Sequence, residues 1–218
     1  MARDLRGESR GPFFLGVGMA VLLFVPLFVF RRVGPLDFWW WMAVNIVLLA
    51  AFAARFDGGY LQALTADLRE GAGRKIAWGV LSAGALCGLF WAGNKLARLV
   101  LPFAAGGIED VYAFKAGASV IRVVILMALV IGPGEELVWR AFLQRRAQQR
   151  LGPGPGFLAA TALYALVHAG SGNPMLVLAA AVCGLFWGGL YLRTGSALLV
   201  AVSHTLWDLA VFVFFPFG

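Results

Sequence analysis

Long apolar runs, separated by short polar stretches, dominate the sequence from residue 12 to residue 215. Each run has about 20 residues, the length at which an α-helix crosses ~30 Å of hydrocarbon. The runs comprise residues 12–30, 38–54, 76–94, 119–143, 156–171, 174–192 and 197–215. The pattern predicts an all-α fold, a polytopic transmembrane bundle of about seven spans.

Two connections between the runs are longer than a turn. Residues 55–75 carry leucines at helical spacing among charged side chains, which predicts a short amphipathic helix in the membrane interface. Residues 96–118 contain a proline, paired glycines and acidic residues, and are expected to form a second surface segment. No internal repeat or linker divides the chain, so residues 1–218 are expected to form one integral membrane domain.

The composition strengthens this assignment. The chain is 61% hydrophobic and only 13% charged, whereas about a quarter of the residues of a soluble domain are charged. The net charge of +7 comes from basic residues at the ends of apolar runs. This placement is typical of membrane anchors that contact lipid head groups, so the bilayer is the expected partner and nucleic acid is not.

The distribution of Lys and Arg predicts the orientation. The first apolar run is long for a signal peptide and lacks a small-residue cleavage site, so a retained first helix is expected. Eleven basic residues fall on one side and six on the other, which predicts a cytoplasmic amino terminus. The inside set is Arg3, Arg6, Arg10, Arg55, Arg69, Arg74, Lys75, Arg145, Arg146, Arg150 and Arg193, and the outside set is Arg31, Arg32, Lys95, Arg98, Lys115 and Arg122.

Two adjacent carboxylates lie inside the fourth apolar run. Placing an ionisable group at membrane depth costs roughly 3 kcal/mol on insertion scales, so such groups usually mark a functional site or a buried pair. Glu136 and Arg140 are i,i+4 neighbours on a helix and are expected to pair. Glu135 is rotated by about 100° and is expected to remain free. Pro133, between two glycines, is expected to loosen the helix just before the glutamates.

The remaining polar residues of the apolar runs fall at a similar depth. His168 in the fifth run and His204 in the seventh are the two histidines of the chain. Counting ~1.5 Å per helical residue from the cytoplasmic ends places them and Glu135 near the bilayer midplane. Tyr164–His168 and His204–Asp208 repeat the i,i+4 spacing. Three helices are therefore expected to bring these groups together around a water-filled pocket.

The motifs Glu-Glu-x-x-x-Arg, aromatic-x-x-x-His and His-x-x-x-Asp follow one another on these three late helices. In this order they resemble the CAAX-protease and bacteriocin-processing family of glutamic intramembrane proteases, which includes the Ras-converting CAAX endopeptidase. The resemblance covers residues 119–215, and residues 1–118 match only as generic membrane helices. The chain departs from the family at two positions, with Tyr164 where Phe is usual and Asp208 where Asn is usual.

The resemblance implies an intramembrane endopeptidase with a catalytic set of Glu135, Glu136, Arg140, His168, His204 and Asp208. Glu135, helped by His168, would take a proton from the water that attacks a peptide carbonyl. Glu136 and Arg140 would clamp the site, and Glu136 is a candidate to orient His168.

His204 and Asp208 would stabilise the oxyanion of the reaction. Asp208 has two alternative roles. A protonated carboxyl would donate to the oxyanion directly, whereas an ionised one would keep His204 charged, and we favour the second.

Other classes of function remain open at this level. No cofactor is expected, but Glu135, His168 and His204 together also suit a zinc-dependent protease, although the local His-Glu-x-x-His signature is missing. Intramembrane carboxylates also occur in proton-coupled transporters, and a non-catalytic scaffold or immunity protein would retain the same fold. The Gly-, Ala- and Arg-rich composition indicates a bacterial inner membrane. A membrane-anchored precursor or carboxyl-terminal sorting anchor is therefore favoured as substrate over a prenylated CAAX protein.

Overall fold

The structure, a computed structural model, describes residues 11–216. Its helices begin with α1 (Gly11–Phe30), α2 (Phe38–Phe56), α3 (Tyr60–Arg69), α4 (Ala72–Val100) and α5 (Ala104–Ala113). A small hairpin, β1 (Arg32–Val33) and β2 (Leu36–Asp37), joins α1 to α2. The arginines Arg3, Arg6 and Arg10, which contributed to the predicted orientation, lie outside the described residues.

The second half of the chain contains the motif-bearing helices. They are α6 (Val120–Leu126), η2 (Met127–Ile131), α7 (Gly132–Val138), η3 (Trp139–Gln144), α8 (Arg145–Leu151), α9 (Pro153–His168), η4 (Ala169–Ser171), α10 (Pro174–Thr194), α11 (Ala197–Leu209) and η5 (Ala210–Phe214). The prediction of an all-α bundle is confirmed, since the hairpin is the one sheet within residues 11–216.

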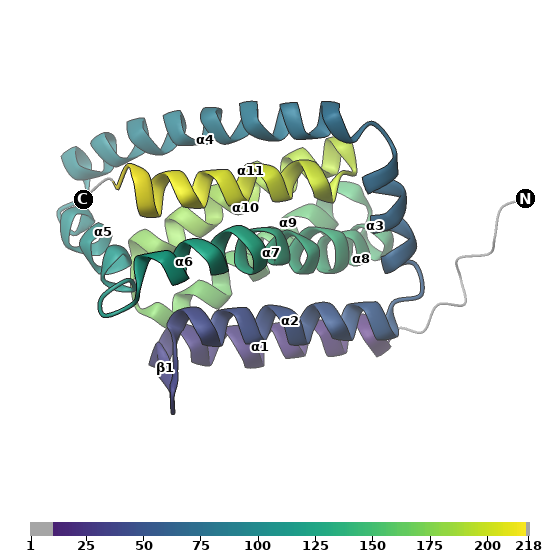
Figure 1. The fold of residues 1–218 in the computed structure, drawn as a ribbon, viewed down its shortest axis with the longest axis horizontal. Coiled ribbons are helices and arrows are strands. Elements are labelled where there is room, and N and C mark those ends of the chain that lie inside the picture. The colour runs from purple at the N-terminus through teal and green to yellow at the C-terminus, as the bar shows by residue number, and fades with distance from the viewer. Residues whose placement is uncertain (1–10, 217–218) are drawn as a thin grey trace, which may run out of the picture.

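The long helices lie side by side along one axis (Figure 1). Helix α1 packs against α2, α4 packs against α11, and α9 packs against both α8 and α10. Helices α3 and α8 lie at one end of the bundle, and α5 and the hairpin lie at the other (Figure 1). The segments from α6 to α8 follow one another in a line through the middle of the bundle.

Among the described residues, five helices are long and apolar enough to cross a membrane, namely α1, α2, α4, α10 and the continuous pair of α11 and η5. The count of about seven spans is not confirmed. The fourth expected span is divided into shorter α and π segments, and the fifth, α9, has only 16 residues. The protein is an integral membrane protein.

The fourth expected span changes helix type on both sides of its glutamates. Segments η2 and η3 are π-helical, and α7 between them has Pro133 in its first turn. Pro133 has no amide hydrogen, so this interruption agrees with the loosening expected at Gly-Pro-Gly. A Cβ atom on Gly132 would lie 2.5 Å from Oγ1 of Thr205, and one on Gly134 would lie 2.4 Å from Ile46. Both glycines therefore let α7 approach α11 and α2 closely.

A buried carboxylate fastens the end of the bundle near α3. Both Oδ atoms of Asp57 accept hydrogen bonds from Arg146, and Oδ2 also accepts one from Arg145, at distances of 2.5 to 2.7 Å. Burial alone raises the pKa of Asp57, but the two guanidinium groups outweigh it and hold this pKa below its usual value. Tyr60, at the start of the predicted interfacial helix, donates from its hydroxyl to the carbonyl of Leu137.

Candidate active site

Glu136 is completely buried and paired on its own helical face. Its Oε1 accepts a hydrogen bond from Nη1 of Arg140 at 2.9 Å, as the i,i+4 spacing predicted. The Arg140 guanidinium lies over the ring of Tyr164, 4.7 Å from its centroid, and 5.7 Å from that of Trp187. Two aromatic faces and one carboxylate thus compensate the buried guanidinium charge.

His204 of α11 lies among three carboxylates. Its Nδ1 is 2.6 Å from Oε1 of Glu136, and its Nε2 is 3.5 Å from Oε2 of Glu135. The same Nε2 is 3.5 Å from Oδ2 of Asp208. Because Oε1 of Glu136 is the acceptor of Arg140, Nδ1 of His204 is the donor to it. The ring of Trp187 stacks on the imidazole at 3.7 Å between centroids, with an interplanar angle of 20°.

Glu135 has two differently placed carboxylate oxygens. Its Oε2 accepts a hydrogen bond from the Tyr164 hydroxyl at 3.1 Å. Its Oε1 makes no hydrogen bond within residues 11–216 and is not completely covered by protein atoms. Since Glu135 lines a cavity, Oε1 faces that cavity. Glu135 is therefore held by one oxygen and open at the other, and the expectation that it stands free was wrong.

His168 of α9 borders the same cavity without touching a carboxylate of the described residues. Its Nδ1 lies 2.7 Å from the carbonyl oxygen of Tyr164. A carbonyl only accepts hydrogen bonds, so Nδ1 carries the proton and Nε2 is left as an acceptor. The ring of Phe28 packs against the imidazole at 4.4 Å between centroids.

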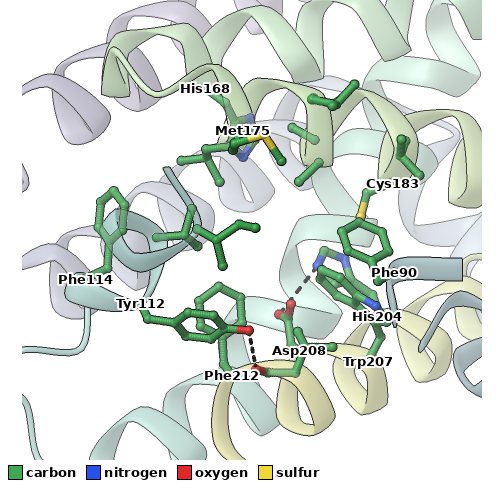
Figure 2. A pocket seen from close by; sticks show the side chains of 18 of the residues that line it. Phe90, Tyr112, Phe114, His168, Met175, Cys183, His204, Trp207, Asp208 and Phe212 are labelled. Carbon is green, nitrogen blue, oxygen red and sulfur yellow. Dashed lines mark hydrogen bonds and ion pairs between the residues drawn. The ribbon is translucent and has the colours of Figure 1, made fainter. Parts of the chain in front are cut away.

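The cavity has a volume of about 310 Å³ and lies in the half of the bundle near α5. Its polar lining is concentrated at the groups just described, and aromatic side chains form much of the remaining wall (Figure 2). Figure 2 shows Asp208 and His204 side by side at one part of the wall, and Tyr112, Phe114 and Phe212 at another. Glu135 and His168 belong to the same lining.

The structure brings the six predicted site residues into one region, from three helical segments and the π segment that follows the glutamates. The polar lining of the cavity consists mainly of Glu135, Tyr164, His168, His204 and Asp208, whereas Glu136 and Arg140 lie behind it. Glu136 was a candidate to orient His168, but it bonds His204 instead, because α11 and not α9 faces its carboxylate.

Sequence reasoning missed the contribution of α10. Trp187 is fully buried between His204 and Arg140, and its Nε1 donates to Oγ of Ser203 at 3.1 Å. The chain has eight tryptophans, all of them in apolar runs. No spacing or charge pattern distinguishes Trp187 from the others, so the sequence carries no signal for this contact.

The alternative zinc set does not form a ligand group in this arrangement. Within residues 11–216, no three His, Cys, Asp or Glu side chains are grouped so that they would hold a metal ion. His168 directs one ring nitrogen to a backbone carbonyl, and both ring nitrogens of His204 face carboxylates. These residues do not fit a zinc site.

Comparison with known families gives one match. Residues 116–210 match the family model of Rce1-like proteins, described as type II CAAX prenyl endopeptidase Rce1-like. Comparisons with curated proteins and with solved structures gave no match. The matched residues contain all three motifs that carried the resemblance, which is confirmed. Over residues 116–210, this integral membrane protein is therefore similar to the Rce1-like family of CAAX endopeptidases, which are peptide hydrolases.

Proposed function

We propose that the protein is an intramembrane endopeptidase of the glutamic type, in which Glu135 activates a water molecule. The observation that carries this proposal is the position of Glu135. One of its oxygens, Oε2, is held by Tyr164 and lies 3.5 Å from Nε2 of His204, and the other faces the cavity. A general base requires such a combination of fixed geometry and open access to water.

In the proposed reaction, Oε1 of Glu135 takes a proton from water as the water oxygen bonds to the peptide carbonyl carbon. The electron pair of the C=O bond moves to the carbonyl oxygen, which becomes an oxyanion. Glu135 then gives the proton to the leaving nitrogen, and the C–N bond breaks to yield a carboxylic acid and an amine. His168, with Nε2 as an acceptor, helps to orient the attacking water.

The oxyanion is stabilised by Nε2–H of His204 in this proposal. Nδ1 of His204 donates to Glu136, and Nε2 lies between Glu135 and Asp208. An imidazole with carboxylates at both nitrogens is best accommodated with both nitrogens protonated. This arrangement favours the role in which Asp208 keeps His204 charged. Glu136, paired with Arg140, supplies the fixed negative charge behind the ring.

The proposed substrate presents an apolar segment next to the scissile bond. Away from the polar groups of the site, aliphatic and aromatic side chains such as Phe114 and Phe212 dominate the cavity wall. A membrane-anchored precursor or a carboxyl-terminal sorting anchor of a bacterial protein fits such a wall, and we favour it over a prenylated CAAX terminus. The inner membrane is the proposed location.

The cavity lies at the end of the bundle opposite α3 and α8. Arg55, Arg145 and Arg193 lie near that opposite end, which we assign to the cytoplasm together with the amino terminus. The cavity then opens toward the outer leaflet. Cysteine placed at exposed Pro35 in the hairpin should react with a membrane-impermeant maleimide on intact cells, and cysteine at exposed Glu70 should not. The reverse labelling pattern would invert this orientation.

Comparative proteomics of membranes tests the function directly. Membranes from cells expressing the active protein are compared with membranes expressing Glu135→Gln, and new protein carboxyl termini are identified. Glu70→Gln is the matched control, because it makes the same chemical change at an exposed position far from the cavity. A protease predicts carboxyl termini that depend on Glu135 but not on Glu70. A scaffold or immunity protein predicts the same termini and the same phenotype in all three membranes.

Chelation separates the proposed mechanism from the zinc alternative. The purified protein is treated with a strong chelator, its metal content is measured, and cleavage is assayed before and after zinc is added back. The glutamic mechanism predicts full turnover without bound metal. Activity lost on chelation and restored by zinc would overturn it.

A further inference from the structure

We propose that the hydroxyl of Tyr164 is a positioning group of this site, which holds the Glu135 carboxylate and offsets the negative charge that Asp208 adds. The inference rests on the proposed function of Glu135 as the base. It concerns the two positions at which the chain departs from the family it resembles, and assigns them to one coupled unit.

Tyr164 is fixed in place on every side. Its side chain is buried, Trp139 packs against its ring edge to face at 5.1 Å, and the Arg140 guanidinium covers one ring face at 4.7 Å. The carbonyl of the same residue is bonded to His168. The phenol therefore has little freedom, and its hydroxyl is directed at Oε2 of Glu135 at 3.1 Å. A hydroxyl that only filled space would not need this direction.

This hydrogen bond determines which oxygen of Glu135 is available. With Oε2 occupied by the hydroxyl, Oε1 is left facing the cavity, where a water molecule would bind. Phenylalanine at position 164 would keep the ring contacts but remove the donor. Within residues 11–216, Oε2 would then keep Nε2 of His204, at 3.5 Å, as its ion-pair partner.

The charges around Glu135 explain why the donor is needed in this chain. Glu136, on the same segment, is already paired with Arg140 of η3 and His204, and His168 on α9 makes no hydrogen bond or ion pair with Glu135 within residues 11–216. On α11, His204 is shared between Glu135 and Asp208, each at 3.5 Å from Nε2. Two carboxylates thus compete for one imidazolium. An asparagine at position 208 would not compete, so Asp208 destabilises the ionised base and the Tyr164 hydroxyl compensates.

Tyr164, Glu135, His204 and Asp208 consequently form one continuous chain of polar contacts, at 3.1, 3.5 and 3.5 Å. The two unusual residues occupy its two ends. Substitutions at the ends of such a chain should not act independently, because each changes the charge state that the other supports.

A double-mutant cycle of Tyr164→Phe and Asp208→Asn tests the coupling. The assay is cleavage of a quenched fluorescent peptide containing a cleavage sequence identified by the membrane proteomics. Tyr164→Phe should lower kcat about tenfold, the loss expected for a hydrogen bond to a charged group, and should leave KM within about twofold. The effect of Asp208→Asn on kcat should be at least about threefold smaller in the Tyr164→Phe background than in the wild type.

Tyr60→Phe is the matched control. Tyr60 is also buried, and its hydroxyl donates to the backbone carbonyl of Leu137 and not to a carboxylate, so the same change should lower thermal stability and leave kcat unchanged. Wild-type kcat in Tyr164→Phe, or independent effects of the two substitutions, would overturn the inference. Glu135→Gln is assayed in parallel. An inactive Glu135→Gln with an unaffected Tyr164→Phe would refute only this inference, whereas an active Glu135→Gln would refute the proposed function itself.

Discussion

The two ends of the bundle are built differently. At the end with α3 and α8, helices meet backbone to backbone, and a Cβ atom on Gly156 of α9 would lie only 2.3 Å from the amide nitrogen of Gln148 on α8. At the end with α5, the same bundle is hollowed by a cavity of about 310 Å³.

The polar contacts differ in the same way. At the closed end, one buried carboxylate, Asp57, joins α2 to α8 through two arginines. At the open end, one half-exposed ion pair joins Arg122 to Asp37, and single side-chain donors reach backbone carbonyls across the helices. These bonds are Tyr112 to Val211, Lys115 to Phe212, Trp39 to Phe114 and Asn173 to Gly107. A closely packed end thus holds the helices in register, so that the other end can stay hollow around its polar groups.

Substitution of Asp57 should have the largest effect on the stability of the closed end. Asp57→Asn leaves two partly buried arginines without their carboxylate, and breaking a buried ion pair costs about 3 kcal/mol or more. Thermal unfolding in detergent measures this loss, and kcat per folded molecule should not change.

The pH dependence of stability is a second test of the contribution of Asp57. Its pKa is lower in the folded protein than in the unfolded chain, so its contribution is complete above the ordinary value of 3.8. The contribution is lost as the pH falls through the lower folded value, and Asp57→Asn should abolish this part of the acid sensitivity. An Asp57→Asn variant with wild-type acid sensitivity would show that the ion pairs of Asp57 with Arg145 and Arg146 do not stabilise the closed end.

Gly156→Ala should cause the next largest loss of stability. The added methyl group would overlap the α8 backbone, which cannot move away as a flexible side chain would. Overpacking of this kind costs about 2 kcal/mol. Chemical unfolding in detergent should register the loss, and a Gly156→Ala protein as stable as the wild type would mean that α8 and α9 are not in close contact.

Asp208→Asn tests whether Asp208 keeps His204 charged at the hollow end. If Asp208 keeps His204 charged, this change should lower kcat about tenfold, or ~1.4 kcal/mol, with little change in unfolding temperature. Retention of full activity would instead show that position 208 donates directly to the oxyanion.

Gly93→Ala should have the smallest effect and serves as the counterpart of Gly156→Ala. Gly93 lines the cavity on α4, and a Cβ atom there would meet nothing within 4 Å. Replacing glycine within a helix should stabilise the protein by about 0.5–1 kcal/mol. The same measurement of unfolding should thus give opposite signs for the two glycines. A destabilised Gly93→Ala protein would show that the cavity wall is as tightly packed as the closed end.

Local spacing predicted the parts of the site that lie on one helix. Glu136–Arg140 and His204–Asp208 follow from the i,i+4 rule, which depends on helix geometry alone. The contact of Glu136 with His204 joins residues 68 positions apart, so it depends on how α7 and α11 pack. The donor role of the Tyr164 hydroxyl toward Glu135 is of the same kind.

The helix types were less predictable than the helices themselves. Gly132 and Pro133 indicated an interruption, but the π segments η2 and η3 have no composition that marks them. Residues 127–131, Met-Ala-Leu-Val-Ile, would suit an ordinary α-helix equally well. Between these two segments, α7 approaches α11 closely where Gly132 meets Thr205, a contact between distant residues that the sequence does not reveal.

The most direct test of the role of Glu135 follows peptide-bond hydrolysis in water enriched in ¹⁸O. Chelator-treated wild-type protein and its Glu135→Gln variant are reconstituted into vesicles with the same membrane-protein fraction, and new carboxyl termini are counted by mass spectrometry. The wild-type protein should produce ¹⁸O-labelled termini, and the variant at least about 100-fold fewer, as expected for loss of a general base. Equal numbers of labelled termini from the two proteins would contradict the account.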